Sequence, residues 1–329
     1  MTTPVRRIVT LIPSATEIVD LLGLTDQIVG RSHECDQPSG IESRPVLTRP
    51  RLDPLAPSAE IHRTVEGLLR DALAVYDLDS ALLAELEPTH IVTQTQCEVC
   101  AVVLIDVEAA ATAQLRQTTE IIVLAPMKLG DMLEDIRDLG RVFGVDSSPA
   151  DALADRLNDI RAVSSKIPDG EKPRVACVEW CDPLMAAGNW VPEIVELAGG
   201  IDLFGTAGVH APLIDASDLF AADPDVVVFM PCGFGLERTA AEAERLLATP
   251  GWNETKAMRA GALYATDGDH YFNRPGPHLV ESVEILAELL HPDRFHFAHE
   301  GTGWSHLDAE TAHTGARRPP ESNQGDVTP

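Results

Sequence analysis

Cys97 and Cys100 lie three positions apart, directly after the apolar run that ends at Val92. A pair formed by His33 and Cys35 follows an earlier apolar run. Three thiols and one imidazole suit a tetrahedral zinc site or another soft-metal centre, although the usual second pair of cysteines with this spacing is absent from the sequence. Two other roles stay open, because the thiols could contact a ligand or pack inertly, cysteine being among the most buried residue types.

A redox pair is a further interpretation of Cys97 and Cys100. Redox pairs of the thioredoxin type follow a tryptophan and begin a helix, and neither feature accompanies these two cysteines. The sequence therefore favours metal binding, ligand contact or packing over redox chemistry.

The segments that must position these side chains alternate in type through the first half of the chain. Short β-branched runs alternate with helical patterns, which is typical of parallel βαβ units. Ser14 and Glu17 have the spacing of a capping box and predict a helix that ends at Gly23. Strands are expected at residues 7–13, 27–35, 44–50, 89–96 and 120–126.

The second half repeats the alternation after a long helical stretch. Its expected strands are residues 173–180, 225–231 and 262–266, and its expected helices are residues 190–200, 237–249 and 277–292. The helical stretch has a break near residues 144–151 and is typical of a rigid connection. We predict an N-terminal α/β lobe (1–127), a connecting long helix (128–167), a C-terminal α/β lobe (168–297) and a polar, aperiodic, disordered tail (298–329).

The charge balance limits the partners of the chain. There are 52 acidic and 25 basic residues, which gives a formal net charge of -27. A nucleic acid is excluded as a partner, because its phosphates would be repelled. An acidic, lysine-poor composition also predicts a halophilic source with an acidic proteome, since salt would screen the self-repulsion.

The apolar runs predict neither a membrane span nor secretion. No run approaches the roughly 18 apolar residues of a transmembrane helix. The first apolar run is interrupted by Pro13 and is too short for a secretory signal. We therefore expect a cytoplasmic protein whose six cysteines are thiols or metal ligands rather than disulfides.

Chemically distinctive side chains follow the predicted strands in both halves. In open parallel sheets, ligands bind outside the carboxyl ends of the strands, where the connecting loops gather. The residues in such positions are His33, Glu34, Cys35, Arg49, Arg51, Gln96, Cys97 and Cys100 in the first half, and Trp180, Cys181, Cys232, Phe234, Tyr271, Phe272, Asn273 and Arg274 in the second.

This layout resembles the class III substrate-binding proteins of ABC importers, a periplasmic-binding-protein-like family, and within it the cobalamin-binding branch. The segments that carry the resemblance are residues 7–24, 29–38, 82–94, 175–205, 220–234 and 272–286. The resemblance implies two Rossmann-like lobes with parallel sheets, a long backbone helix, and a small-molecule ligand held between the lobes. Siderophore, haem and metal binders share this pattern, so these ligands are alternatives to a corrinoid.

Carried over to this chain, the resemblance implies a corrinoid in contact with loops of both lobes. Such a large, mostly apolar macrocycle needs aromatic faces and a few polar donors. His33 or a cysteine thiolate could also be an axial ligand of the cobalt. The implied contacts are His33, Glu34, Cys35, Arg49, Gln96 and Cys97 in the first lobe, and Trp180, Asn189, Trp190, Phe234, Tyr271, Phe272, Asn273 and Arg274 in the second.

The chain departs from the family at two positions. Importer-docked members carry an exposed glutamate on each lobe for the permease, and Ala81 and Ser217 stand there in this chain. Glu85 and Asp218 are neighbours that could substitute. Docking to an ABC permease is therefore doubtful, and we expect a cytoplasmic relative that binds a corrinoid without serving an importer.

An enzyme of the same fold, such as a chelatase that inserts a metal, is the alternative from a different class. Its candidate residues are His33, Glu34 and Glu179, the last near the end of an apolar strand where burial would raise the pKa of its carboxyl. The sequence contains no phosphate-binding loop, no H-E-x-x-H motif and no recognisable Ser-His-Asp motif, so binding is favoured over catalysis.

Overall fold

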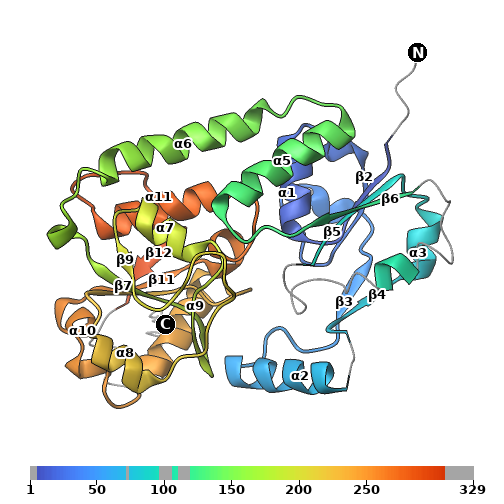
Figure 1. Cartoon of the computed structure of the whole chain (residues 1–329). Coiled ribbons are helices and arrows are strands. Elements are labelled where there is room, and N and C mark those ends of the chain that lie inside the picture. The colour runs from blue at the N-terminus through green and yellow to red at the C-terminus, as the bar shows by residue number, and fades with distance from the viewer. Residues whose placement is uncertain (1–5, 72–73, 96–105, 110–118, 308–329) are drawn as a thin grey trace, which may run out of the picture.

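The computed structural model describes residues 6–71, 74–95, 106–109 and 119–307. Figure 1 shows two α/β lobes, each built around a sheet with parallel strands, with α5 and α6 running along one side of both. This is the predicted fold class.

The first lobe contains a four-stranded parallel sheet. Its order is β2-β1-β5-β6, and its strands are β1 (Ile8–Thr10), β2 (Ile28–Arg31), β5 (His90–Gln94) and β6 (Glu120–Leu124). Apolar side chains on both faces of β1 and β5 are buried, which is why these strands read as continuous apolar runs. Helix α1 (Pro13–Leu21) follows β1, and α3 (Ser80–Glu85) precedes β5.

The second lobe contains a six-stranded sheet whose centre is parallel. Its order is β12-β11-β10-β7-β8, and β9 also pairs with β7. The strands are β7 (Arg174–Cys181), β8 (Leu184–Ala186), β9 (Ile201–Asp202), β10 (Val226–Phe229), β11 (Leu263–Thr266) and β12 (Trp304–His306). The helices are α7 (Val191–Leu197), α8 (Ala216–Ala222), α9 (Leu236–Leu247), α10 (Lys256–Ala260) and α11 (Leu279–Leu290).

Two helices, and not one, connect the lobes. They are α5 (Leu129–Phe143) and α6 (Ser148–Ser164), and the break predicted near residues 144–151 is confirmed. Gly144 ends α5 with a φ of 59°, a left-handed conformation that glycine adopts without strain. One continuous cluster of buried apolar residues runs from α1 through α5 and α6 to α7 and α11, so the connection is packed against both lobes.

An arm extends from the first lobe beneath the gap between the lobes (Figure 1). It consists of β3 (Thr48–Pro50), α2 (Ser58–Arg70) and β4 (Tyr76–Leu78), and β3 pairs with β4 in a separate antiparallel sheet. The predicted strand at residues 44–50 is therefore divided: Val46 forms an isolated parallel bridge with Arg31 of β2, and Thr48–Pro50 leave the parallel sheet to pair with β4.

Two further predictions are corrected. Helix α1 begins at Pro13 without a side-chain cap, so Ser14 and Glu17 do not form the predicted capping box. Residues 298–307 are not part of a disordered tail, because β12 pairs with β11 inside that range. Among the helices that the structure describes, none is both long and apolar enough to cross a membrane.

Candidate functional site

Loops at the carboxyl ends of the two sheets meet at Arg274, which follows β11. Its guanidinium is only 5% exposed. It donates hydrogen bonds to Glu17 of α1 at 3.2 Å and to the two carboxylate oxygens of Asp36 at 2.5 and 3.3 Å, both residues of the first lobe. A further hydrogen bond of 3.0 Å reaches Asp269 of its own lobe. Arg274 therefore links the lobes through a bidentate, charge-assisted pair.

The three carboxyls around Arg274 differ in their surroundings. Burial raises the pKa of Glu17, and the nearby Arg274 charge offsets this only in part. Burial also acts to raise the pKa of Asp36, but its hydrogen bonds and ion pair with Arg274 outweigh burial and lower that pKa. Asp36 is therefore the charged partner of Arg274, and the buried Glu17 favours the neutral form.

The end of β2 forms a second group with the arm. His33 Nδ1 lies 2.7 Å from the Thr48 hydroxyl, and the His33 and Tyr76 rings lie 5.2 Å apart. The Tyr76 hydroxyl donates a 3.0 Å hydrogen bond to Glu34. Burial, followed by the charge of Arg31, lowers the pKa of His33, so its imidazole is neutral near pH 7.

Glu34 is the most perturbed carboxyl of this group. Its side chain is 37% exposed, yet atoms of both lobes surround its carboxyl. Burial raises the pKa of Glu34 to about 7 against the hydrogen bond from Tyr76, and the Asp269 carboxylate of the second lobe raises it further. Glu34 therefore lies where the two lobes face each other.

Aromatic residues of the second lobe surround the end of β7. Trp180 is half-buried, donates its indole N–H to the Asp182 carbonyl at 3.0 Å, and lies 5.3 Å from the Phe234 ring. The Arg238 guanidinium covers Phe234 at 3.5 Å from the ring centroid. Phe234 is thus enclosed, and Trp180 is the member of this pair with accessible surface.

Several residues of the predicted ligand set are structural supports. Trp190 is 4% exposed and donates its indole N–H to the Phe272 carbonyl at 2.8 Å, while Phe272 is fully buried. The Asn273 amide donates to the carbonyls of Met230 and Gly268 at 2.9 and 2.6 Å. These side chains are engaged inside the second lobe, and direct ligand contact by the buried Trp190 and Phe272 stays a prediction.

Asn189 and Tyr271 are neither fully engaged as structural supports nor fully exposed. Asn189 is buried at a φ of 51°, and its side-chain oxygen accepts no hydrogen bond from the part of the chain that the structure describes. Tyr271 is half-buried and lies edge-on to His270 at 4.7 Å. Arg49, by contrast, is exposed on β3 in the arm.

The predicted metal ligands are not brought together in the described residues. The Cys35 thiol is fully buried and accepts a 3.0 Å hydrogen bond from Thr16, whereas His33 contacts Thr48. Burial raises the pKa of Cys35 to about 11, which disfavours the thiolate that a metal requires. The described residues therefore do not favour Cys35 as a ligand, and its role in a metal site stays a prediction.

The other metal-site residues cannot complete the set in the described structure. Gln96, Cys97 and Cys100 lie outside the described residues. Within residues 6–71, 74–95, 106–109 and 119–307, no group of three or more His, Cys, Asp or Glu side chains is placed to hold a metal ion.

Sequence reasoning missed Glu17 and Tyr76 as members of the site, whereas the family resemblance includes Asp36 at the end of the ligand-facing loop that begins at His33. Glu17 was assigned to a helix cap, and Tyr76 belongs to an arm that the pattern did not predict. A local signal existed for Asp36, which directly follows the chemically distinctive His33–Cys35 segment.

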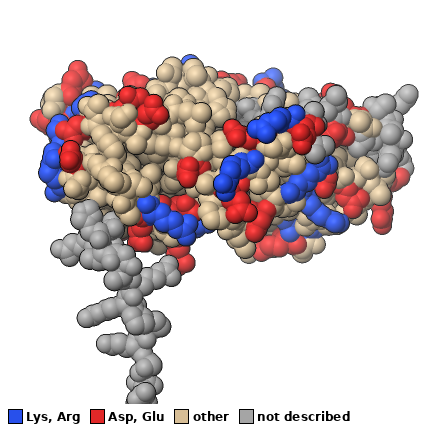
Figure 2. Space-filling model, turned by 90° about the horizontal axis from the view of Figure 1, so that it is seen from below, with Lys and Arg blue, Asp and Glu red and all other residues tan. Residues whose placement is uncertain are grey.

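The positions that correspond to the family's docking glutamates are exposed on both lobes. Ala81 and Glu85 are exposed on α3, and Ser217 and Asp218 are exposed on α8. Glu85 and Asp218 thus remain accessible carboxylates beside the two substituted positions. Figure 2 shows acidic side chains interspersed with basic ones over the face seen from below.

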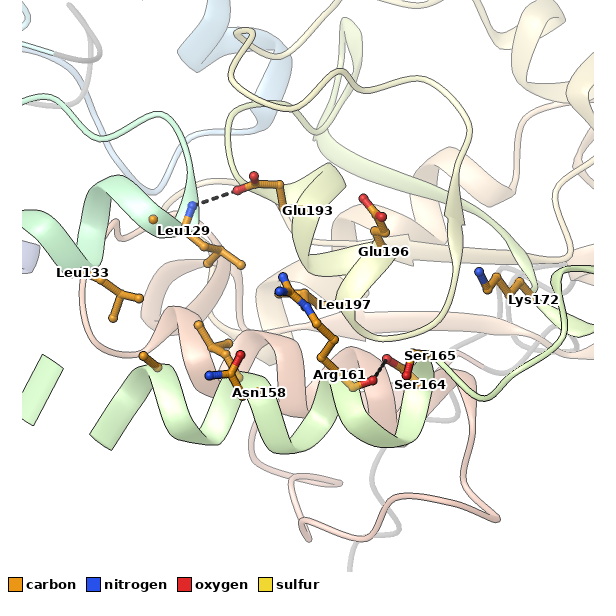
Figure 3. A pocket seen from close by; sticks show the side chains of 13 residues that line it. Leu129, Leu133, Asn158, Arg161, Ser164, Ser165, Lys172, Glu193, Glu196 and Leu197 are labelled. Atoms are coloured by element: carbon orange, nitrogen blue, oxygen red, sulfur yellow. Dashed lines mark hydrogen bonds between the residues drawn. The ribbon is translucent and has the colours of Figure 1, made fainter. Parts of the chain in front are cut away.

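A separate pocket of about 630 Å³ lies between α5, α6 and α7 (Figure 3). Leu129, Leu133 and Leu197 form part of its apolar wall, and Asn158 and Arg161 of α6 are among its polar residues. None of the predicted ligand residues lines this pocket. It is distinct from the loops that meet at Arg274.

The family model described as "Periplasmic binding protein" matches residues 8–270. The chain is 22% identical over 308 residues to the vitamin B12-binding protein of Vibrio cholerae, covering 87% of this chain and 90% of that protein.

Two solved structures show the same fold. The periplasmic vitamin B12 binding protein BtuF of Vibrio cholerae superposes with a TM-score of 0.62 at 18% identity, covering 88% of this chain and 98% of that one. The periplasmic heme-binding protein RhuT from Roseiflexus sp. RS-1 superposes with a TM-score of 0.63 at 22% identity, covering 87% of this chain and 98% of that one.

Proposed function

Because the chain belongs to the periplasmic binding protein family, we propose that it binds a corrinoid between the strand-end loops of its two lobes. The observation that carries the proposal is the similarity, over 87% of this chain, to a protein named for vitamin B12 binding. The accessible face of Trp180 and the polar groups of His33 and Glu34 supply the mixed lining that a large amphipathic macrocycle needs.

Haem is the second candidate ligand, since a heme-binding protein superposes as well as the vitamin B12 binder does. Both ligands carry a metal that can take an axial imidazole. His33 suits this role in the tautomer whose Nδ1–H donates to the Thr48 hydroxyl 2.7 Å away, because the neutral imidazole that its lowered pKa favours then presents an unprotonated Nε2. An Nε2 bond to cobalt or iron would then fix the orientation of the macrocycle.

The other predictions concern a chelatase activity, a zinc site and a cytoplasmic location without an importer. The family consists of substrate-binding proteins and not enzymes, which removes the chelatase alternative. A zinc site formed by His33, Cys35, Cys97 and Cys100 stays a prediction, and the burial of the Cys35 thiol makes Cys35 its least favoured ligand. A cytoplasmic location without an importer stays a prediction, and Glu85 and Asp218 are the residues that a permease would be expected to contact if the chain serves one.

The proposal is tested by incubating the purified protein separately with cyanocobalamin and haemin, removing excess ligand and recording absorbance spectra. We expect a retained corrinoid band at near-equimolar occupancy. Retention of haemin alone would reassign the ligand, and retention of neither would reject the proposal. For the axial role, His33→Ala is expected to shift the spectrum of the bound macrocycle, with Arg141→Ala on α5 as an exposed control outside the predicted ligand set.

A further inference from the structure

The arm of the first lobe is anchored on the second lobe at the start of α2. The Ser58 hydroxyl donates a 3.1 Å hydrogen bond to Glu242 of α9, and the two residues are 2% and 6% exposed. Arg238, also of α9, donates to the carbonyls of Pro54 and Ala56, the latter at 2.7 Å. Because these groups are buried or held by two donors, the arm is a fixed connection between the lobes.

One face of α2 is apolar and is turned toward the second lobe. Ile61, Val65 and Leu68 repeat at intervals of four and three residues, which places them along one side of the helix. Ser58 lies three residues before Ile61 and seven before Val65, so it shares that side. Since the Ser58 side chain contacts α9, the apolar face also points across from the first lobe to the second.

Among the residues that the structure describes, this apolar face is not part of a core cluster. Ile61, Val65 and Leu68 are only half-buried, and α2 contributes no residue to the three clusters of buried apolar residues formed by the described parts of the chain. Helix α2 contacts β7, which ends at Trp180 and Cys181. Glu242, which accepts the Ser58 hydrogen bond, also lies close enough to Cys181 to raise the pKa of its thiol, so the start of α2 is near the strand end that carries the accessible Trp180 ring.

We propose that the apolar face of α2 is a wall of the ligand site, opposite the Trp180 ring, and that it selects for a macrocycle with a broad apolar face. This inference rests on the proposed function and extends it. A protein that binds such a ligand must cover most of its surface, and the loops that meet at Arg274 approach it from only two sides. The arm supplies a third side, and the Ser58–Glu242 contact fixes its position.

The test compares an apolar-to-serine change on this face with the same change elsewhere in the arm. The variant is Ile61→Ser with Val65→Ser, and the control is Leu55→Ser, at a position that is 83% exposed before α2. Dissociation constants for cyanocobalamin and haemin are measured for both. We expect the double variant to bind the retained ligand about 10- to 100-fold more weakly than wild type, because two buried apolar contacts are lost, and Leu55→Ser to bind as wild type.

A measurement on the wild-type protein keeps the inference testable if the double variant folds poorly. Hydrogen exchange of the α2 amides is compared with and without the bound ligand, and we expect slower exchange when the ligand is present. Unchanged affinity in the folded double variant, or unchanged exchange of α2, would overturn the inference while leaving the proposed function intact. Failure of wild type to retain either probe would instead reject the proposed function, and the inference with it.

Discussion

Arg274 of the second lobe and Asp36 of the first form a bidentate pair at 2.5 and 3.3 Å, although they are 238 residues apart in the sequence. The pair lies where the strand-end loops meet, beside the buried Glu17. Together with the arm contact between Ser58 and Glu242, it holds the lobes together at two separate places.

Replacing Arg274 should destabilise the contact between the lobes. Arg274→Ala leaves the charged Asp36 without its cation, and because the Asp36 side chain is 53% exposed and screened by solvent, the loss is about 1 to 2 kcal/mol. We expect a loss of about this size in the free energy of unfolding measured in urea, with a smaller loss for Arg274→Lys, which keeps the charge but not the two parallel bonds. Arg49→Ala is the exposed control, and an equal effect there would contradict the assignment.

The raised pKa of Glu34 predicts a pH dependence of stability. Its pKa is about 7 in the folded state and about 4.5 in the unfolded state, so between these values the folded protein binds the additional proton. The contribution of Glu34 to the free energy of unfolding should therefore fall as the pH rises from about 4.5 to 7 and stay constant above pH 7. Glu34→Gln should remove this slope and stabilise the protein at pH 8 relative to wild type, by less than about 1 kcal/mol because the side chain is partly exposed.

The matching control for Glu34 is a carboxyl on the same lobe that faces away from the second lobe, and Glu85→Gln on α3 serves this purpose. Urea unfolding at pH 5 and at pH 8 measures the difference in the free energy of unfolding between each variant and wild type. A Glu34→Gln variant whose stability relative to wild type is the same at both pH values would contradict the raised pKa.

Glu281 predicts the opposite dependence. Its hydrogen bonds to His278 and Arg156 outweigh burial and lower the pKa of Glu281 to about 2, and the Arg156 contact of 2.8 Å joins α6 to α11. The contribution of Glu281 to the free energy of unfolding is complete above about pH 4.5 and is lost as the pH falls toward 2. We expect Glu281→Gln to cost about 2 kcal/mol at pH 7.

The check on Glu281 is urea unfolding of the variant and wild type at pH 7 and at decreasing pH. Asp159→Asn, an exposed change on α6, is the control. The difference between Glu281→Gln and wild type should shrink as the pH approaches 2, and a difference that does not change with pH would argue for a loss of packing instead.

The parallel strands were predictable because buried β-branched runs such as those of β1, β5 and β10 leave an uninterrupted local pattern. The arm was not, since the pairing of β3 with β4 instead of with the parallel sheet depends on a partner 26 residues away even for the closest pair, Pro50 with Tyr76. No local periodicity of the sequence distinguishes a strand that pairs with β4 from one that joins the parallel sheet.

In the site, too, residues could be predicted from their local position in the sequence, whereas contacts between distant residues could not. His33 and Glu34 were predicted from their place after a strand, and the structure puts them at the lobe junction. The spacing of His33 and Cys35 fits a shared metal, because residues two apart in an extended chain point to the same side. In the structure residues 33 and 34 form a turn instead, and the two side chains enter separate environments. The link from Arg274 to Glu17 spans 257 residues, so only the folded chain discloses it.

The cysteines allow a prediction about metal binding that distinguishes Cys35 from Cys97 and Cys100. If the purified protein contains zinc, Cys97→Ser with Cys100→Ser should remove it, whereas Cys35→Ser should keep it, because the Cys35 thiol is buried with its pKa raised to about 11. Elemental analysis of the three proteins measures this. Loss of zinc in folded Cys35→Ser, or unchanged zinc in the double variant, would reject the division of roles.

The acidic surface predicts that salt stabilises the fold. A net charge of -27 repels itself most strongly in the compact state, and the screening length falls from about 30 Å at 0.01 M salt to about 3 Å at 1 M. We expect the melting temperature to rise with KCl mainly below about 0.5 M, and NaCl to act equally at the same ionic strength, because screening depends on ionic strength alone. A melting temperature that is already maximal at 0.01 M would contradict the halophilic interpretation. A rise that begins only above about 1 M would indicate exclusion of salt from the protein surface instead.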